Sequence, residues 1–123
     1  MKLHFLLLPT AVIALAALPA HALFGAKTKA AEQVGAILFR DKGCAHCHGV
    51  GGSGGKKGPS LGGLRKDKLW TPKKITGQIF DGGQKMPPFR DSVTDQEAAQ
   101  LVAYLRAKRK PSPPPAPQAN HPQ

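Results

Sequence analysis

The stretch CAHCHGVGGSGGKKGPSL, residues 44 to 61, contains both cysteines of the 123-residue chain. Two residues separate Cys44 from Cys47, and His48 follows directly after the second cysteine. Six glycines then occur between residues 49 and 58, which favours a loop over a helix or a strand. The question is why two thiols and an imidazole stand directly before a flexible loop, and the rest of the sequence narrows the answer.

Residues 1–22 have the pattern of a secretory signal peptide. A short basic start at Lys2 leads into an apolar run, and small residues at Ala20 and Ala22 fit a cut after Ala22. An uncleaved membrane anchor is the alternative, but Pro9 and Pro19 interrupt or end a run shorter than the roughly 20 residues of a span. We therefore expect a periplasmic protein with no stable membrane insertion after cleavage.

The remaining length predicts one domain over residues 23–110, followed by a tail over residues 111–123. The tail is dense in proline and lacks apolar periodicity, so it is expected to be extended and disordered. A domain this small buries little surface and often depends on a disulfide, a metal or a cofactor. Two cysteines so close in sequence close a tiny loop, which makes a structural disulfide a poor explanation.

The formal net charge of +11 favours acidic protein partners or an anionic surface. Judged by charge alone, nucleic acid is the alternative binding partner. Export argues against nucleic acid, and the sequence has no basic motif interleaved with aromatic residues.

Three helices are predicted, and no alternating strand pattern is present. The first covers residues 29–42 and ends at Gly43. Its apolar face comprises Ala31, Val34, Ile37 and Leu38, and is widened by Phe39. A short second helix begins at Thr71-Pro72 and buries three apolar residues, Ile75, Ile79 and Phe80.

The last helix begins with a capping box formed by Thr94 and Glu97. Its buried stripe comprises Ala98, Leu101, Val102 and Leu105. The helix is expected to run to Pro111, with the basic residues 108–110 in its last turn, where they suit the helix dipole.

The Cys-x-x-Cys-His motif in an exported protein indicates covalent attachment of haem c. Two cysteines on one helical turn can each form a thioether with a vinyl group of the porphyrin, and His48 then lies beneath the ring as an iron ligand. A thioredoxin-like pair would need a βαβ context, and zinc would need about four well-placed ligands. His46 is expected to be an outward spacer, and His121 lies in the tail.

Met86 is the candidate for the second axial ligand. It is the domain's one methionine and lies between Gly82-Gly83 and Pro87-Pro88, on a predicted loop. Lys85 could bind iron only after losing its proton. The carbonyl of Pro59 is the candidate acceptor for the Nδ1 proton of His48, since metal-bound histidines usually donate their other ring proton.

These motifs, together with Gly35, Phe39 and LVAYL near the end, resemble the small class I c-type cytochromes over about residues 30 to 109. The resemblance implies an all-α fold of three to five helices wrapped around one covalently attached haem. It also implies first and last helices that cross near Gly35 and Tyr104, a His48 and Met86 ligand pair, and a haem propionate bonded by Trp70.

The function implied is a periplasmic, monomeric carrier of single electrons that cycles between Fe(III) and Fe(II) and docks with acidic redox partners. Because protein ligands fill both axial positions, we expect no enzymatic activity. One alternative is a haem c subunit of a larger oxidoreductase complex. Another is a haem-based ligand sensor or peroxidase, which needs a displaceable sixth ligand.

Overall fold

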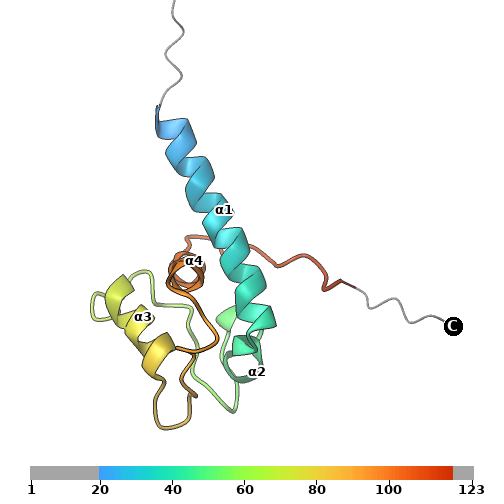
Figure 1. The fold of residues 1–123 in the computed structure, drawn as a ribbon, viewed down its shortest axis with the longest axis vertical. Helices are drawn as coiled ribbons and strands as arrows, with labels where there is room; N and C mark the ends of the chain where they lie inside the picture. The colour runs from blue at the N-terminus through green and yellow to red at the C-terminus, as the bar shows by residue number, and fades with distance from the viewer. Residues whose placement is uncertain (1–19, 118–123) are drawn as a thin grey trace, which may run out of the picture.

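The computed structural model describes residues 20–117. It contains four α-helices: α1 (Ala20–Asp41), α2 (Cys44–His48), α3 (Pro72–Asp81) and α4 (Asp95–Leu105), with a short 3-10 turn over Val50–Gly52. The described part of the chain has no strand. The predicted all-α architecture is therefore confirmed, and long connections join its helices (Figure 1).

Helices α1 and α4 cross steeply, with α1 along the vertical of Figure 1 and α4 seen nearly end-on. Gly35 lies at this crossing: a Cβ there would lie 2.1 Å from the carbonyl oxygen of Gln100 and 2.6 Å from Cβ of Tyr104. The rings of Phe39 and Tyr104 pack beside it, with centroids 5.5 Å apart. The expected crossing near Gly35 and Tyr104 is thus confirmed, and only glycine permits this approach.

Replacing Gly35 with alanine should destabilise the holoprotein by about 2 kcal/mol, because overpacking typically costs about 1–3 kcal/mol. Gly77, in the interior of α3, is the matched control, because nothing beyond its own stretch of helix lies within 4 Å of the position that a Cβ would take there. Gly77→Ala should stabilise by up to about 1 kcal/mol through helix propensity. Denaturant unfolding measures both, and a Gly35→Ala variant as stable as the wild type would refute the close crossing.

The hydrophobic core joins α1, α3 and α4. The predicted stripe of α4 is buried, as are the three apolar residues of α3. On α1 the expectation was partly wrong: Phe39 is buried as predicted, but Val34 is 38% exposed, and Ala36, which was not predicted to face the core, is buried. The close approach at Gly35 turns that side of α1 toward α4, and apolar periodicity alone did not indicate this face.

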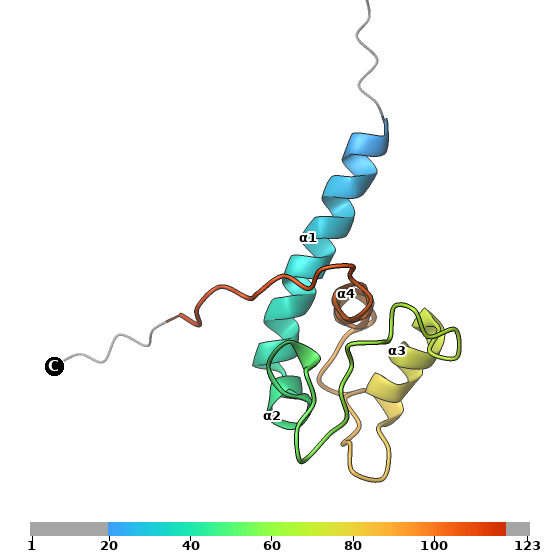
Figure 2. The ribbon, with the colours of Figure 1, turned by 180° about the vertical axis from the view of Figure 1, so that it is seen from behind.

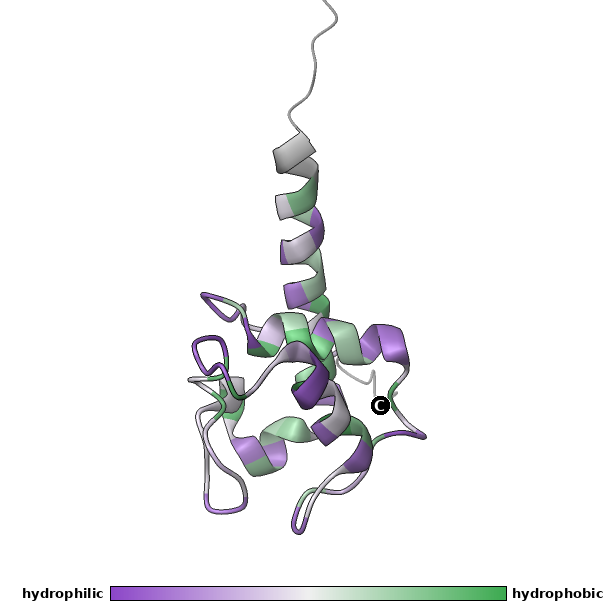
Figure 3. Ribbon diagram, turned by 90° about the vertical axis from the view of Figure 1, so that its left-hand side faces the viewer, coloured by the Kyte–Doolittle hydropathy of each residue, from purple (hydrophilic) through white to green (hydrophobic). Residues whose placement is uncertain are grey.

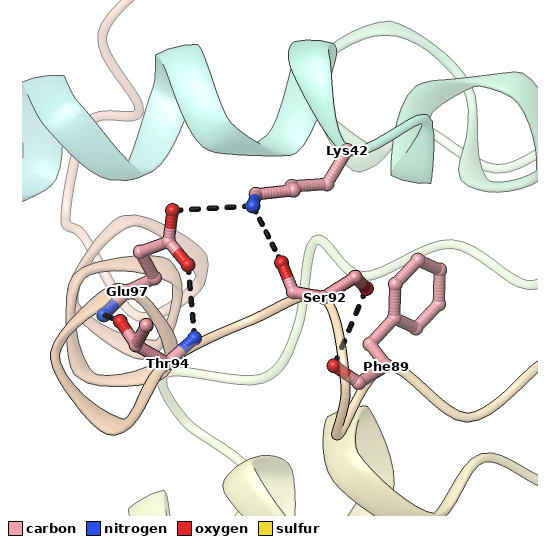
Figure 4. Close-up of polar contacts among 5 residues, drawn as sticks. All are labelled: Lys42, Phe89, Ser92, Thr94 and Glu97. Carbon is pink, nitrogen blue, oxygen red and sulfur yellow. Dashed lines mark hydrogen bonds and ion pairs between the residues drawn. The ribbon is translucent and has the colours of Figure 1, made fainter.

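The predicted starts of α3 and α4 are confirmed, whereas α1 begins at Ala20 and not at residue 29. The Thr71 side chain accepts a hydrogen bond from the backbone N–H of Lys74, and Pro72 occupies the first helical position of α3. Thr94 and Glu97 form the reciprocal capping box of α4 (Figure 4). These hydrogen bonds, with an ion pair to Lys42, hold the pKa of Glu97 below its usual value.

The start of α4 is also tied to the end of α1 (Figure 4). Lys42 Nζ lies 3.2 Å from a carboxylate oxygen of Glu97 and donates to the carbonyl oxygen of Ser92 at 2.5 Å. The segment that connects the Met86 loop to α4 is therefore fixed against α1, close to the cysteine motif.

The predicted end of α4 was wrong. The helix ends at Leu105, and Arg106 leaves the helical conformation with φ −100° and ψ 4°. Residues 108–110 therefore do not lie in a last turn. Lys110 instead turns back, and its Nζ donates to the carbonyl oxygens of Gly51 and Leu61 at 3.2 and 3.1 Å. Burial lowers the pKa of Lys110.

The N-terminal part of α1 projects beyond the rest of the domain (Figure 3), and Phe24 is 77% exposed there. The proposed cut after Ala22 falls in the first turn of α1, while residues 1–19 lie outside the described range. Among residues 20–117, no helix combines the length and apolar content that crossing a bilayer requires.

The chain after α4 passes across α1 (Figure 2), where Gln33 donates to the carbonyl oxygen of Ser112 and Arg40 to that of Pro114. His121 lies outside the described residues, and the boundaries at residues 22 and 110 stay predictions.

Candidate haem-binding site

Helix α2 carries the two cysteines and His48 on little more than one turn. Gly43, with φ 80°, ends α1 and starts α2, a left-handed conformation that glycine adopts without strain. His46 is exposed, in line with its predicted place as a spacer. The cysteines do not form a disulfide, and burial raises the pKa of the Cys44 thiol.

The glycine-rich loop returns the chain to the imidazole of His48. Nδ1 of His48 lies 2.9 Å from the carbonyl oxygen of Pro59, the acceptor predicted from the sequence. The N–H of Gly54 donates to the carbonyl of His48 at 2.6 Å, and a Cβ on Gly58 would lie 3.2 Å from Nδ1. This arrangement fixes the ring orientation and leaves Nε2 as the nitrogen available to a metal.

Met86 lies on a loop that is closed at its base. The N–H of Gly83 donates to the carbonyl of Met86 at 2.8 Å, and the N–H of Phe89 donates to the carbonyl of Ile79 at 3.1 Å. Gln78 Nε2 donates to the carbonyl of Gly82 at 2.7 Å. The half-buried Met86 thus has a fixed backbone, although no regular element contains it.

One cavity of about 560 Å³ is lined by both His48 and Met86. Its volume lies within the range of roughly 300–1,000 Å³ usual for ligand pockets. The apolar part of its lining comprises Leu61, Leu64, Trp70, Ile75, Ile79 and Leu105, and its polar part includes Gln78, Gln84 and Lys85. A smaller adjoining cavity is lined by Cys44 and Cys47, again with His48 and Met86.

These residues fit a haem. The apolar wall suits a porphyrin face, the thiols adjoin the space, and imidazole and thioether groups belong to the known donor set of haem iron. Trp70 lines the cavity as well, and Lys74 Nζ lies 4.7 Å from its ring centroid. Pro59, also in the lining, is exposed and takes part through its carbonyl oxygen.

Sequence reasoning missed three residues that support the site: Gln78, Arg106 and Lys110. Arg106 and Lys110 donate to backbone carbonyls that are far away in sequence, whereas Gln78 donates to the carbonyl of Gly82, four residues further along the chain. In the sequence, a single glutamine on a helix, or one cation within a run of basic residues, does not indicate that its side chain will bind a backbone carbonyl. Only the path of the loops reveals these contacts.

Residues 30–105 match the family described as cytochrome c oxidase, cbb3-type, subunit III. The chain belongs to this family. As a class I monohaem c-type cytochrome, it binds one haem c covalently and transfers electrons through it.

The cytochrome is similar to the cbb3-type cytochrome c oxidase subunit FixP of Sinorhizobium medicae strain WSM419. They are 36% identical over 87 residues, which covers 61% of this chain and 29% of that protein. FixP of Rhizobium meliloti strain 1021 is 34% identical with the same coverage. The cytochrome thus spans less than a third of the length of the curated relatives that it matches.

The solved structure of dihydro-heme d1 dehydrogenase NirN is also similar to the cytochrome, with 33% identity and a TM-score of 0.51. The likeness covers 69% of this chain and 17% of that one. In both comparisons the cytochrome corresponds to one part of a longer protein.

The expectation of no enzymatic role is wrong at the level of the family. The relatives are an oxidase subunit and a dehydrogenase, so haem domains of this kind occur within enzymes. The physical reason is that two axial ligands restrict the chemistry of one iron. They do not restrict what a catalytic centre elsewhere in the same assembly does with the electron.

Proposed function

We propose that this cytochrome is a periplasmic electron-transfer domain in which His48 and Met86 bind the haem iron and Cys44 and Cys47 form the two thioether bonds. The observation that carries the proposal is the shared cavity, which both axial candidates line while the cysteines adjoin it. The bound haem supplies a one-electron Fe(III)/Fe(II) couple.

The protein's own residues hold the two ligands in place in both oxidation states. Pro59 fixes the His48 ring, and the hydrogen bonds of Gly83, Phe89 and Gln78 fix the Met86 loop. Ligands that do not move on reduction favour fast electron transfer. The buried apolar side chains around the cavity exclude water, and the thioether sulfur favours the reduced state.

The surface beside the cavity is basic, which supports an acidic redox partner. Residues 56–74 contain seven basic side chains against one acidic side chain, Asp67. This segment includes the cavity residues Pro59, Leu61, Leu64 and Trp70. Hydrophilic segments are prominent on the loops in Figure 3. Positive charge in this place steers association and makes it sensitive to salt.

A second candidate is a haem c subunit of a larger oxidoreductase complex. The similarity to FixP, named as an oxidase subunit, favours this function. The two candidates share the same site and chemistry and differ only in whether the partner stays bound. Sedimentation of the holoprotein purified from its native membranes and periplasm distinguishes them, since a complex subunit co-purifies with larger proteins and a carrier sediments as a monomer.

Oxidation of the ferrous holoprotein by small complexes tests the proposed function. Anionic hexacyanoferrate(III) should react several-fold more slowly when the ionic strength rises from about 10 mM to about 0.5 M, because salt screens the attraction. A cationic cobalt(III) complex should show no such decrease.

Charge-removing variants locate the docking surface in the same assay. Lys73→Gln with Lys74→Gln should weaken the salt dependence, whereas Lys27→Gln with Lys29→Gln, which removes equal charge from the exposed N-terminal part of α1, should affect it less. Slow oxidation that is insensitive to salt, together with ready binding of carbon monoxide at neutral pH, would exclude an electron-transfer domain with two protein ligands.

A further inference from the structure

Residues 62–70 form one wall of the haem cavity without any helix or strand. Their internal hydrogen bonds are few: the N–H groups of Lys66 and Asp67 donate to Gly63, and that of Leu69 donates to the Asp67 carboxylate. These bonds shape a local turn but do not attach it to the domain. A cavity wall of this kind needs an anchor outside itself, since an unattached loop is free to move and admits water.

Arg106 provides that anchor. One terminal nitrogen of its guanidinium donates to the carbonyl oxygens of Leu64 and Trp70, at 2.9 and 2.7 Å. The other donates to the carbonyl of Arg65 at 3.4 Å. The three acceptors lie 36 to 42 residues away in sequence, and Leu64 and Trp70 both line the cavity.

The charge of Arg106 has no carboxylate partner among residues 20–117, where the ion pairs involve other cations. The side chain is partly buried and directly follows Leu105, another cavity residue. A positive charge in this position favours the form of the haem that carries the extra electron. Because low-dielectric surroundings screen it less than water does, its effect persists at high salt.

We propose that Arg106 is a positioning residue for the haem, which fixes the Leu64–Trp70 segment as a cavity wall and raises the reduction potential with an unpaired charge held behind that wall. The inference rests on the proposed function, since it assumes a haem in this cavity. Arginine suits this role because two separate nitrogens of its planar head reach three carbonyls of the segment, whereas a lysine would have to reach all three from a single nitrogen.

Trp70 makes the proposal testable, because it is the one tryptophan of the chain. Energy transfer to a nearby haem quenches tryptophan emission, so movement of the wall raises it. In folded holoprotein, Arg106→Gln should increase the emission about two- to threefold and lower the midpoint potential, measured at high salt. Arg106→Lys should increase the emission similarly. Its midpoint potential should stay close to that of the wild type, because lysine retains the positive charge.

Arg109→Gln is the control, since Arg109 is exposed on the same segment and the substitution removes an equal charge. It should leave emission and potential unchanged. Should Arg106→Gln not fold, Arg106→Lys alone still tests the anchor through its emission. The proposal is overturned if both Arg106 variants match the wild type, or if Arg109→Gln lowers the potential equally. Absence of haem from the wild type would refute the proposed function instead.

Discussion

Met86→Ala should lower the midpoint potential of the holoprotein by a quarter or more of the roughly 0.8 V that axial ligands span. The ferrous variant should also bind carbon monoxide readily at neutral pH, which the wild type should not. The thioether stabilises ferrous iron, and its removal withdraws this effect and frees the sixth position. The loop itself should survive, because backbone hydrogen bonds at Gly83 and Phe89 close its base.

Spectroelectrochemical titration measures the potential, and absorption spectra under carbon monoxide measure access to the iron. Lys85→Arg is the matched control, since Lys85 is the exposed neighbour of Met86 and lines the same cavity, and the substitution removes its amine while keeping the positive charge. It should leave both properties unchanged. If Lys85→Arg alters the spectrum while Met86→Ala does not, the assignment of the sixth ligand is wrong.

Cys44→Ser combined with Cys47→Ser should abolish haem staining of the polypeptide after denaturing electrophoresis. Serine hydroxyls do not form stable thioether-like bonds with the vinyl groups, so only axial ligation would remain, and denaturation releases it. Each single variant should retain staining through its remaining bond. The double variant should also lose much of its stability, because a folded state that no longer retains its ligand loses that binding free energy.

His46→Ala provides the control within the same motif. His46 lies between the cysteines but is exposed, so the variant should stain like the wild type. Undiminished staining of the double serine variant would show that the haem is attached elsewhere.

Local sequence patterns predicted much of the fold because the interactions concerned are local. The capping box of Thr94 and Glu97 spans four residues, and Gly43 needed only its own positive φ to end a helix. The prediction at Gly35 worked for a different reason. The crossing followed from the resemblance to the class I c-type cytochromes, and the cost of a glycine inside a helix agrees with a close approach at that position.

The errors arose where long-range contacts override local preference. The basic residues at the chain end suited a helix terminus, yet Arg106 and Lys110 bind loop carbonyls on the other side of the fold. Val34 is exposed because the crossing of α1 with α4 turns another face of α1 toward the core, and the hydrophobicity of Val34 alone did not indicate this. At the site, the motifs predicted which residues are candidates to bind the haem. They did not predict which side chains hold the connecting loops in place.

The proposed site and function both depend on haem attachment through sulfur, and the intact mass of the wild-type protein, made with haem-maturation machinery, is the most direct test of that attachment. We expect a polypeptide heavier by one haem, whose colour stays with the protein during extraction with acidified organic solvent. A polypeptide with the mass of the bare chain, and colour found entirely in the organic phase, would contradict this expectation.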